Sequence, residues 1–227
     1  MTLAPEELEA RILLEEGGRI AVDKPPDLPT SGRSLDDPDC LQHALIARAG
    51  GMVWAVHQLD ADTSGVNLFT TERALVEPLK RAMSSADGVK EYLAIVHGAP
   101  EWNTRTCEAR IGPCEADGAR TLGVSSTGRH ASTRFTTLAR SARHALIRAR
   151  LGTGRTHQIR IHLAHLGHPL VGEEWYRRPP CEIHPRQALH AERLRLGAPF
   201  ELELRAALPA DLVELAGALG LDGDRER

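Results

Sequence analysis

The chain has 227 residues, a length that supports one sizeable hydrophobic core. Apolar residues make up 41% and charged residues 26%, which are globular proportions that exclude a disordered or fibrous chain. The formal net charge of -3 argues, taken alone, against a nucleic-acid partner, because domains that bind phosphate usually carry a surplus of cations. The sequence holds no run of about 18 apolar residues, so a membrane-spanning helix is excluded.

The charges are unevenly distributed along the chain. Residues 1–40 hold ten carboxylates against four cations, whereas residues 118–172 hold nine arginines and no carboxylate. Local rather than net positive charge is what phosphate contacts require, so this acid-free stretch could form a face that binds a polyanion. A solvated basic face with no partner is the alternative.

The four cysteines lack the close pairing of a disulfide framework, and the N-terminus has no charged segment followed by an apolar core. We therefore expect reduced thiols and a cytoplasmic protein. The cysteines at 107 and 114 could be combined with Cys181 and His184 into a zinc site, but their spacing is too long for the usual zinc knuckle. We expect no metal.

Proline, glycine and apolar spacing predict the elements of the first half of the chain. Pro5 and the glutamates after it predict a helix over residues 5–16 that stops at Gly17. Thr71 is a plausible cap for a later helix. The remaining predictions are a strand at 20–22, a proline-rich loop at 24–29, a helix from about 41 that ends at glycines 50 and 51, a strand at 52–56, a polar turn at 57–65, a strand at 66–69, a helix at 72–83 and a strand at 92–96.

The second half begins with several strands between residues 105 and 151, for which antiparallel pairing is the simplest arrangement. A helix follows residues 154–156, with an apolar stripe at Ile159, Leu163 and Leu166 and a stop at Gly167. A half-buried strand at 200–205 and a helix at 209–219 complete the chain.

These elements predict an α+β fold, in which a single domain is built around a large mixed, mostly antiparallel sheet flanked by helices. The core of this domain is expected at about residues 18–208, and residues 222–227 are expected to be frayed. A monomer is the default expectation.

Two segments are richer in reactive side chains than packing requires: residues 57–65, which contain Asp60, and residues 152–162, which contain Arg160. A carboxylate stays ionised in a closed site when a cation pairs with it, and the planar fork of an arginine suits that pairing. On spacing alone, however, Asp60 and Thr63 could simply close a turn, and the second segment could be only a well-capped helix.

Five motifs in one order identify a resemblance that runs through nearly the whole chain. They are residues 23–26 (DKPP), 57–65 (HQLDADTSG), 90–94 (KEYLA), 154–162 (GRTHQIRIH) with 166–172 (LGHPLVG), and 186–191 (RQALHA). In these motifs the chain resembles the RluA-type family of pseudouridine synthases. The resemblance implies the catalytic fold of that family and isomerisation of uridine to pseudouridine in ribosomal or transfer RNA, without cofactor or metal.

By the same resemblance Asp60 is the catalytic carboxylate, Arg160 pairs with it, and Tyr92 lies against the target base and can take part in proton transfer. The uridine must leave its stack before its C1′ and C5 atoms can be handled, which implies base flipping. Contacts to a stem-loop of the RNA are expected from five further residues: Lys24, His57, Gln58, Arg155 and His157.

The chain departs from the family pattern at two positions. Gln58 stands where the family usually has an arginine that engages the flipped-out RNA, and Glu173 stands where an aspartate is common. Only about twenty residues precede the Lys-Pro motif, so no S4-type RNA-binding domain is expected.

Two other classes of function are compatible with parts of the sequence. A non-catalytic RNA-binding module with the same fold is the main alternative, and Gln58 is its only sequence support. A metal-dependent hydrolase has less support, because His157 and His162 are five residues apart and not the three or four that place ligands on one helix face. The particular RNA and uridine are not encoded in any residue pattern.

Overall fold

The computed structural model describes residues 3–34, 37–116, 119–181 and 183–221. These residues form a ten-stranded mixed sheet, a separate two-stranded sheet and a small number of helices, which confirms the predicted fold class. The predicted frayed tail at 222–227 lies outside the described residues. None of the helices in the described ranges has the length and apolar character needed to cross a membrane.

The helices are α1 Pro5–Glu9, α2 Leu41–Ala49, α3 Val76–Met83, α4 Gln158–His165 and α5 Ala210–Ala218, with one 3-10 helix, η1 Arg73–Leu75. The strands are β1 Ile12–Glu16, β2 Arg19–Lys24, β3 Trp54–Ala55, β4 Ser64–Thr70, β5 Val89–His97, β6 Thr104–Cys107, β7 Ile111–Ala116, β8 Ala119–Val124, β9 Thr133–Arg140, β10 His144–Leu151, β11 Leu189–Leu196 and β12 Leu202–Arg205.

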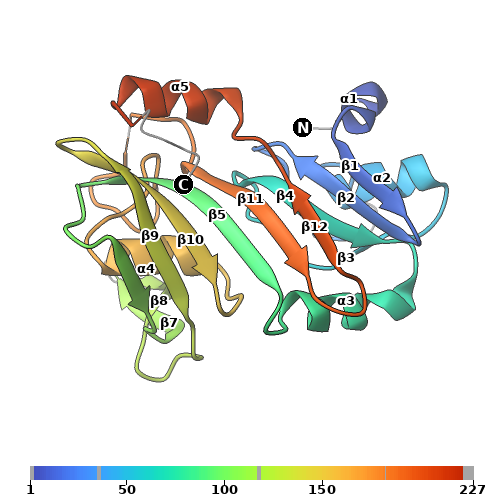
Figure 1. Ribbon diagram of the computed structural model, residues 1–227, viewed down its shortest axis with the longest axis horizontal. Coiled ribbons are helices and arrows are strands. Elements are labelled where there is room, and N and C mark those ends of the chain that lie inside the picture. Colours follow the sequence, from blue (N-terminus) through green and yellow to red (C-terminus); the bar gives the residue numbers. More distant parts are fainter. Residues whose placement is uncertain (1–2, 35–36, 117–118, 182, 222–227) are drawn as a thin grey trace. The chain divides into compact units, whose positions relative to one another are not determined.

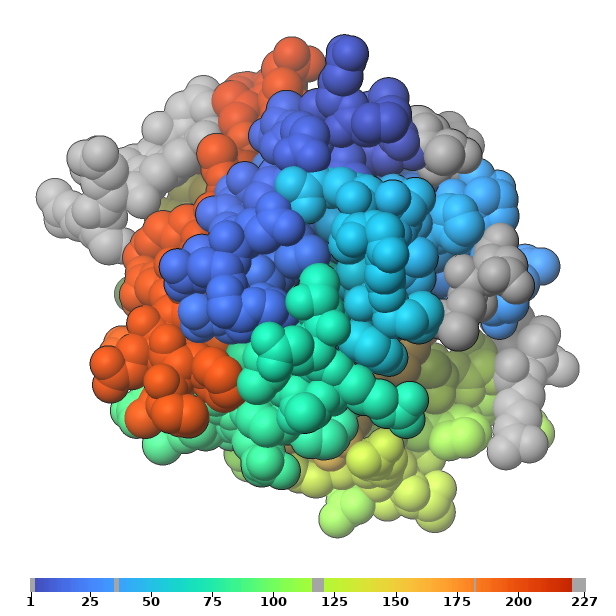
Figure 2. Space-filling view, turned by 90° about the vertical axis from the view of Figure 1, so that its right-hand side faces the viewer, coloured from blue at the N-terminus to red at the C-terminus, as the bar shows by residue number. Residues whose placement is uncertain are grey.

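The chain divides into two compact units, of which the first comprises Met1–Lys90 and His190–Leu208. Its strands follow the order β1-β2-β4-β11, with β3 also paired to β4 and β12 to β11 (Figure 1). The β4–β11 pair is parallel and the other pairs of this unit are antiparallel. Figure 2 shows the orange-red segment of β11 and β12 lying beside the blue and teal N-terminal segments, although they are far apart in sequence.

Strand β2 has apolar side chains on both faces, because helices or strands cover both sides of it. Ile20 and Val22 pack with Leu41 and Leu45 of α2 on one side. Ala21 packs on the other side, in a second cluster with side chains of α3, β11 and β12. Burial on both faces explains why this short segment is recognisable as a strand from its apolar run.

The second unit comprises Glu91–Leu189 and Pro209–Arg227. Its strands follow the order β5-β10-β9-β6, all antiparallel, and β7 and β8 form a hairpin beside them. Helix α4 packs against β8 and β9, and it lies behind β9 in the view of Figure 1. Ile161 of this helix is buried with Ile111 and Ala131. The antiparallel arrangement predicted for residues 105–151 is confirmed.

Three local predictions were wrong or incomplete. Residues 12–16 form strand β1 rather than the end of a helix, because Gly17 and Gly18 adopt positive φ and turn the chain so that β1 pairs with β2. The cap predicted at Thr71 is absent: the N-cap residues are Glu72 for η1 and Leu75 for α3, and neither makes a side-chain cap hydrogen bond. Strand β11 had no sequence prediction. The assignment of all 227 residues to one catalytic domain stays a prediction.

Candidate active site

Asp60 lies in the loop that joins β3 to β4, and it is half-buried. Its carbonyl accepts the N–H of Thr63 at 3.0 Å, which closes a turn immediately before the fully buried strand β4. The turn predicted from spacing is therefore present. It also presents the Asp60 side chain from a short connection between two strands, where the backbone has little freedom.

Lys24, the last residue of β2, holds this loop through hydrogen bonds. The side chain is completely buried, and its ammonium donates hydrogen bonds to the carbonyls of Pro25, Leu28 and Ala61 at 2.8, 2.7 and 2.7 Å. The predicted contact of Lys24 with RNA phosphate is therefore wrong, because a cation enclosed by three carbonyls has no exposed surface to offer a phosphate. Lys24 instead ties the Lys-Pro motif to the residue that follows Asp60.

A second set of hydrogen bonds holds the other end of the same loop. The hydroxyl of Thr30 accepts the N–H of Leu59 at 3.0 Å and donates to the side-chain oxygen of Asn67 at 2.8 Å. The amide of Asn67 in turn donates to the carbonyl of His57 at 3.1 Å. Both Thr30 and Asn67 are buried, so the loop is fixed on either side of Asp60.

His57 and Gln58 open the loop and differ in exposure. Nε2 of His57 accepts the N–H of Leu68 at 3.2 Å, and burial, assisted by the charge of Lys90, lowers the pKa of His57 to about 4. His57 is therefore neutral at physiological pH and does not supply a positive charge for RNA. Gln58 is exposed and donates to the hydroxyl of Ser31 at 3.0 Å, so a contact with RNA stays a prediction there.

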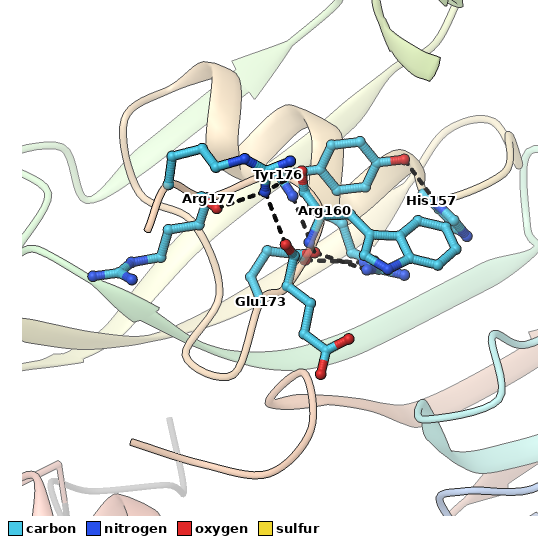
Figure 3. A network of polar contacts seen from close by, with 8 residues as sticks. His157, Arg160, Glu173, Tyr176 and Arg177 are labelled. Atoms are coloured by element: carbon cyan, nitrogen blue, oxygen red, sulfur yellow. Dashed lines mark hydrogen bonds and ion pairs between the residues drawn. The ribbon is translucent and has the colours of Figure 1, made fainter. Parts of the chain in front are cut away.

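In the second unit, Arg160 is buried on α4 and forms a bidentate ion pair with Glu173 (Figure 3). Its Nε and Nη2 atoms donate to the two oxygens of Glu173 at 2.9 and 2.7 Å. The carboxylate of Glu173 is completely buried and also accepts the N–H groups of Trp175 and Tyr176, at 3.0 and 3.3 Å. The pair thus fixes both the guanidinium plane and the chain that follows Glu173.

Three aromatic rings surround this ion pair. The guanidinium carbon of Arg160 lies 5.2 Å from the ring centre of Trp175 and 5.3 Å from that of Tyr176, which are cation–π distances. His157 adopts a left-handed backbone conformation at the start of α4, and its Nδ1 is joined to the Tyr176 hydroxyl by a hydrogen bond of 2.7 Å (Figure 3). His157 therefore has an internal partner, and its predicted RNA contact stays a prediction.

The residues before α4 are ordered by Gln158. Its side-chain oxygen accepts the N–H of Arg155 at 3.0 Å and the hydroxyl of Thr153 at 2.7 Å, and its amide donates to Ser132 and Thr133. Arg155 is half-buried, and its Nε donates to the carbonyl of His130 at 3.0 Å. The contact of Arg155 with RNA phosphate stays a prediction.

Tyr92 lies on β5 with 8% of its surface exposed, directly opposite Ala149 of β10. Two arginines of the acid-free stretch, Arg148 and Arg150, lie on the other face of β10, because Arg148 is paired with Leu93 and Arg150 with Glu91. The acid-free stretch is therefore not one continuous surface around Tyr92, as its sequence alone could suggest.

The predicted site residues fall into two sets. The structure places Lys24, His57, Gln58 and Asp60 in the first unit, around one loop. It places Tyr92, Arg155, His157 and Arg160 in the second unit, the last three at the start of α4. The pairing of Asp60 with Arg160 stays a prediction.

Sequence reasoning noted Glu173 only as a conservative change, and it missed Trp175 and Tyr176. The sequence feature that could have pointed to them is a carboxylate directly after Gly172. Gly172 has a positive φ and lies so close to the carbonyl of Arg186 that there is no room for a side chain at this position. A forced turn followed by an acid and two aromatics indicates a built site rather than a surface loop. Cys40, Cys107, Cys114 and Cys181 are free cysteines in the structure.

Comparison with known proteins shows which proteins the chain is similar to. A profile of the family described as RNA pseudouridylate synthase matches residues 19–165. The ribosomal large subunit pseudouridine synthase D of Yersinia pestis is 32% identical over 246 residues, covering 96% of this chain and 73% of that protein. The protein of the same name from Vibrio cholerae is 34% identical over 252 residues, covering 98% and 74%.

Solved structures show the same fold. The human RNA pseudouridylate synthase domain containing 1 superposes with a TM-score of 0.70 and 26% identity, over 95% of this chain and 96% of that one. The human RNA pseudouridylate synthase domain containing 4 reaches a TM-score of 0.78 at 22% identity, over 95% of both chains. The chain belongs to the RNA pseudouridine synthase family. Because pseudouridine synthases are isomerases, it is an enzyme of that class.

Proposed function

We propose that the chain converts uridine to pseudouridine in ribosomal RNA, with Asp60 as the catalytic carboxylate. The observation that carries this is the loop that presents Asp60, which is fixed by the buried Lys24 on one side and by Thr30 on the other. A catalytic group held in this way loses little freedom when substrate binds.

The reaction is an isomerisation, so its atoms balance within the substrate. The bond between N1 of uracil and C1′ of the ribose breaks, the base turns, and a bond from C5 to C1′ forms. C5 then gives up its proton and N1 gains one. Asp60 acts either as nucleophile at the sugar or as the group that promotes cleavage of the glycosidic bond. Tyr92 lies against the base and serves in proton transfer.

Arg160 is the cation proposed to keep Asp60 ionised. Glu173 takes the guanidinium edge formed by Nε and Nη2 and holds the plane of the guanidinium. In this proposal Glu173 is a positioning residue that orients Arg160. The target uridine leaves its stack to reach the site, and Gln58, Arg155 and His157 are proposed to contact the RNA around it.

Ribosomal RNA is favoured as the substrate because the matched relatives from Yersinia pestis and Vibrio cholerae are named for the large ribosomal subunit. Transfer RNA is the second candidate substrate. The cytoplasmic location and the monomeric state remain predictions of the sequence.

The test is to incubate the purified protein with transcripts of large-subunit RNA, small-subunit RNA and transfer RNA made without pseudouridine, and to measure pseudouridine by nucleoside analysis. We expect product with the large-subunit transcript and none with Asp60→Asn, which corresponds to a loss of at least ~1,000-fold. Asp62→Asn is the matched control, because Asp62 is half-buried two residues away in the same loop and is expected to retain activity.

Product from Asp60→Asn at the wild-type rate would contradict the assignment of the carboxylate. Binding of all transcripts without any product from the wild type would instead indicate the non-catalytic RNA-binding module. Product with transfer RNA alone would overturn the choice of substrate but not the reaction.

A further inference from the structure

Trp175 is an aromatic residue that exposes a large part of its apolar side chain to solvent. Its surface is 59% accessible, the largest value among the exposed large apolar residues of the described ranges. An indole carries a large apolar area that is normally covered when nothing binds it. The residue is not part of any motif that led to the family resemblance.

The exposed ring is nevertheless held in one place. Its backbone N–H donates to the buried carboxylate of Glu173 at 3.0 Å. Its ring contacts His157 edge-on, with 5.0 Å between ring centres and 62° between planes, and the guanidinium carbon of Arg160 lies 5.2 Å from its centre. A rigid aromatic ring with a large accessible area is a surface on which a planar group can stack without an ordering cost.

The charges near Trp175 favour RNA, rather than an apolar protein surface, as the partner that covers the ring. Arg177 and Arg178 follow within three residues, and Arg178 is exposed, whereas Glu174 is the single exposed carboxylate among residues 173–178. Arginines close in sequence to an exposed aromatic residue combine attraction for phosphate with a stacking surface for a base.

We propose that Trp175 is a stacking site for a nucleobase of the bound RNA that flanks the target uridine. The inference rests on the proposed function, since it takes Arg160 to mark the reacting centre, and the 5.2 Å between Arg160 and the indole places that base next to the centre. Stacking is tolerant of base identity, so the site adds affinity and position rather than a sequence code.

The test measures binding separately from catalysis. In the Asp60→Asn background, affinity for the large-subunit RNA transcript is measured at several salt concentrations for Trp175, Trp175→Ala and Trp175→Phe. We expect Trp175→Ala to weaken binding by about 5- to 100-fold and Trp175→Phe by about 3-fold or less, because phenylalanine keeps a stacking face. The slope of log affinity against log salt should not change, since stacking releases no counterions.

Fluorescence gives a second measurement that does not need a truncated side chain. Binding of the same transcript should quench the indole emission of the full chain, and the quench should vanish in Trp175→Phe, which retains Trp54 and Trp102. Val213→Ala, at another exposed apolar residue of the same unit, is the control and should leave binding unchanged.

Equal affinity of Trp175→Ala and the parent, an equal loss in Trp175→Phe, or a reduced salt slope would each overturn the stacking site. In the Asp60-containing enzyme, an effect on KM with kcat kept supports it, whereas a fall in kcat alone would show that Trp175 only supports Arg160. Failure of the proposed function appears separately, as absence of product from the wild type.

Discussion

At the scale of single residues, the role of a charged side chain depends on what surrounds it. Lys24 belongs to a motif shared with the family, and a lysine in a loop next to proline suggests a surface cation. The structure encloses it completely among three carbonyls, one of them next to Asp60. A buried ammonium is tolerated only when its donors are satisfied, so Lys24 is a structural anchor of the candidate catalytic loop.

Replacing Lys24 by methionine keeps the length of the side chain but removes all three hydrogen bonds. We expect Lys24→Met to lower the free energy of unfolding by about 2–4 kcal/mol, because three carbonyls lose their donor. Urea unfolding measures this difference. Lys80→Met is the control: the side chain of Lys80 is 45% exposed and paired with Glu77, and its loss should cost less than about 1 kcal/mol.

The same substitution also tests whether Lys24 contacts an RNA phosphate. If Lys24 had contacted phosphate, Lys24→Met would reduce the slope of log affinity against log salt by about one. We expect the slope to stay at the wild-type value. A slope reduced by that amount in a folded variant would restore the phosphate contact that the structure argues against.

At the scale of elements, the parallel pair of β4 and β11 joins segments from the two ends of the first unit. Ser64 is paired with His190 and Gly65 with Ala191, and the hydroxyl of Ser64 donates to Nδ1 of His190 at 2.9 Å. Strand β4 starts four residues after Asp60, so this pairing fixes where the candidate catalytic loop ends. Gly65 is required because its φ is +108° and a Cβ there would lie 2.3 Å from the carbonyl oxygen of Ala191.

Gly65→Ala is therefore expected to push β4 away from β11. We expect the free energy of unfolding to fall by about 2–4 kcal/mol, from the strained backbone and the overlap with a carbonyl that cannot move aside. Thermal or urea unfolding measures this. Gly51→Ala is the matched control, because a Cβ at Gly51 meets nothing within 4 Å. A loss of less than about 0.5 kcal/mol at Gly65 would show that the strands can separate at little cost.

At the scale of the whole molecule, stability depends on partly or fully buried histidines that must stay neutral. Burial is the main cause that lowers the pKa of His57 and of His97 to about 4, and burial also lowers the pKa of His162. These three histidines occur in both compact units. Unfolding releases them to an ordinary pKa near 6.5, so the unfolded chain binds more protons between pH 4 and 6.5.

The protein should consequently be most stable above pH 6.5 and lose stability as the pH falls toward 4. In His57→Gln the loss of unfolding free energy between pH 7 and 4.5 should be smaller by about 2 kcal/mol, since one of the histidines no longer titrates. Urea unfolding at a series of pH values measures this. An unchanged pH dependence in His57→Gln would contradict the argument.

The sequence by itself determined the reaction class and the fold class. Residues 57–65 and 154–162 are contiguous motifs, and contiguous motifs can be recognised without knowing what they touch. The helix at α2 and the strands at β5, β9 and β10 were also predictable, because their apolar patterns and the terminal glycines of α2 act locally.

Only the tertiary structure decided which charged groups are enclosed and which partners they take. The burial of Lys24, the pairing of Arg160 with Glu173, the strand at 12–16 and the separation of Tyr92 from Arg148 on opposite sheet faces all depend on contacts between distant parts of the chain. Burial and pairing are set by the neighbours that folding brings together, and these neighbours leave no periodic trace in the sequence around the residue.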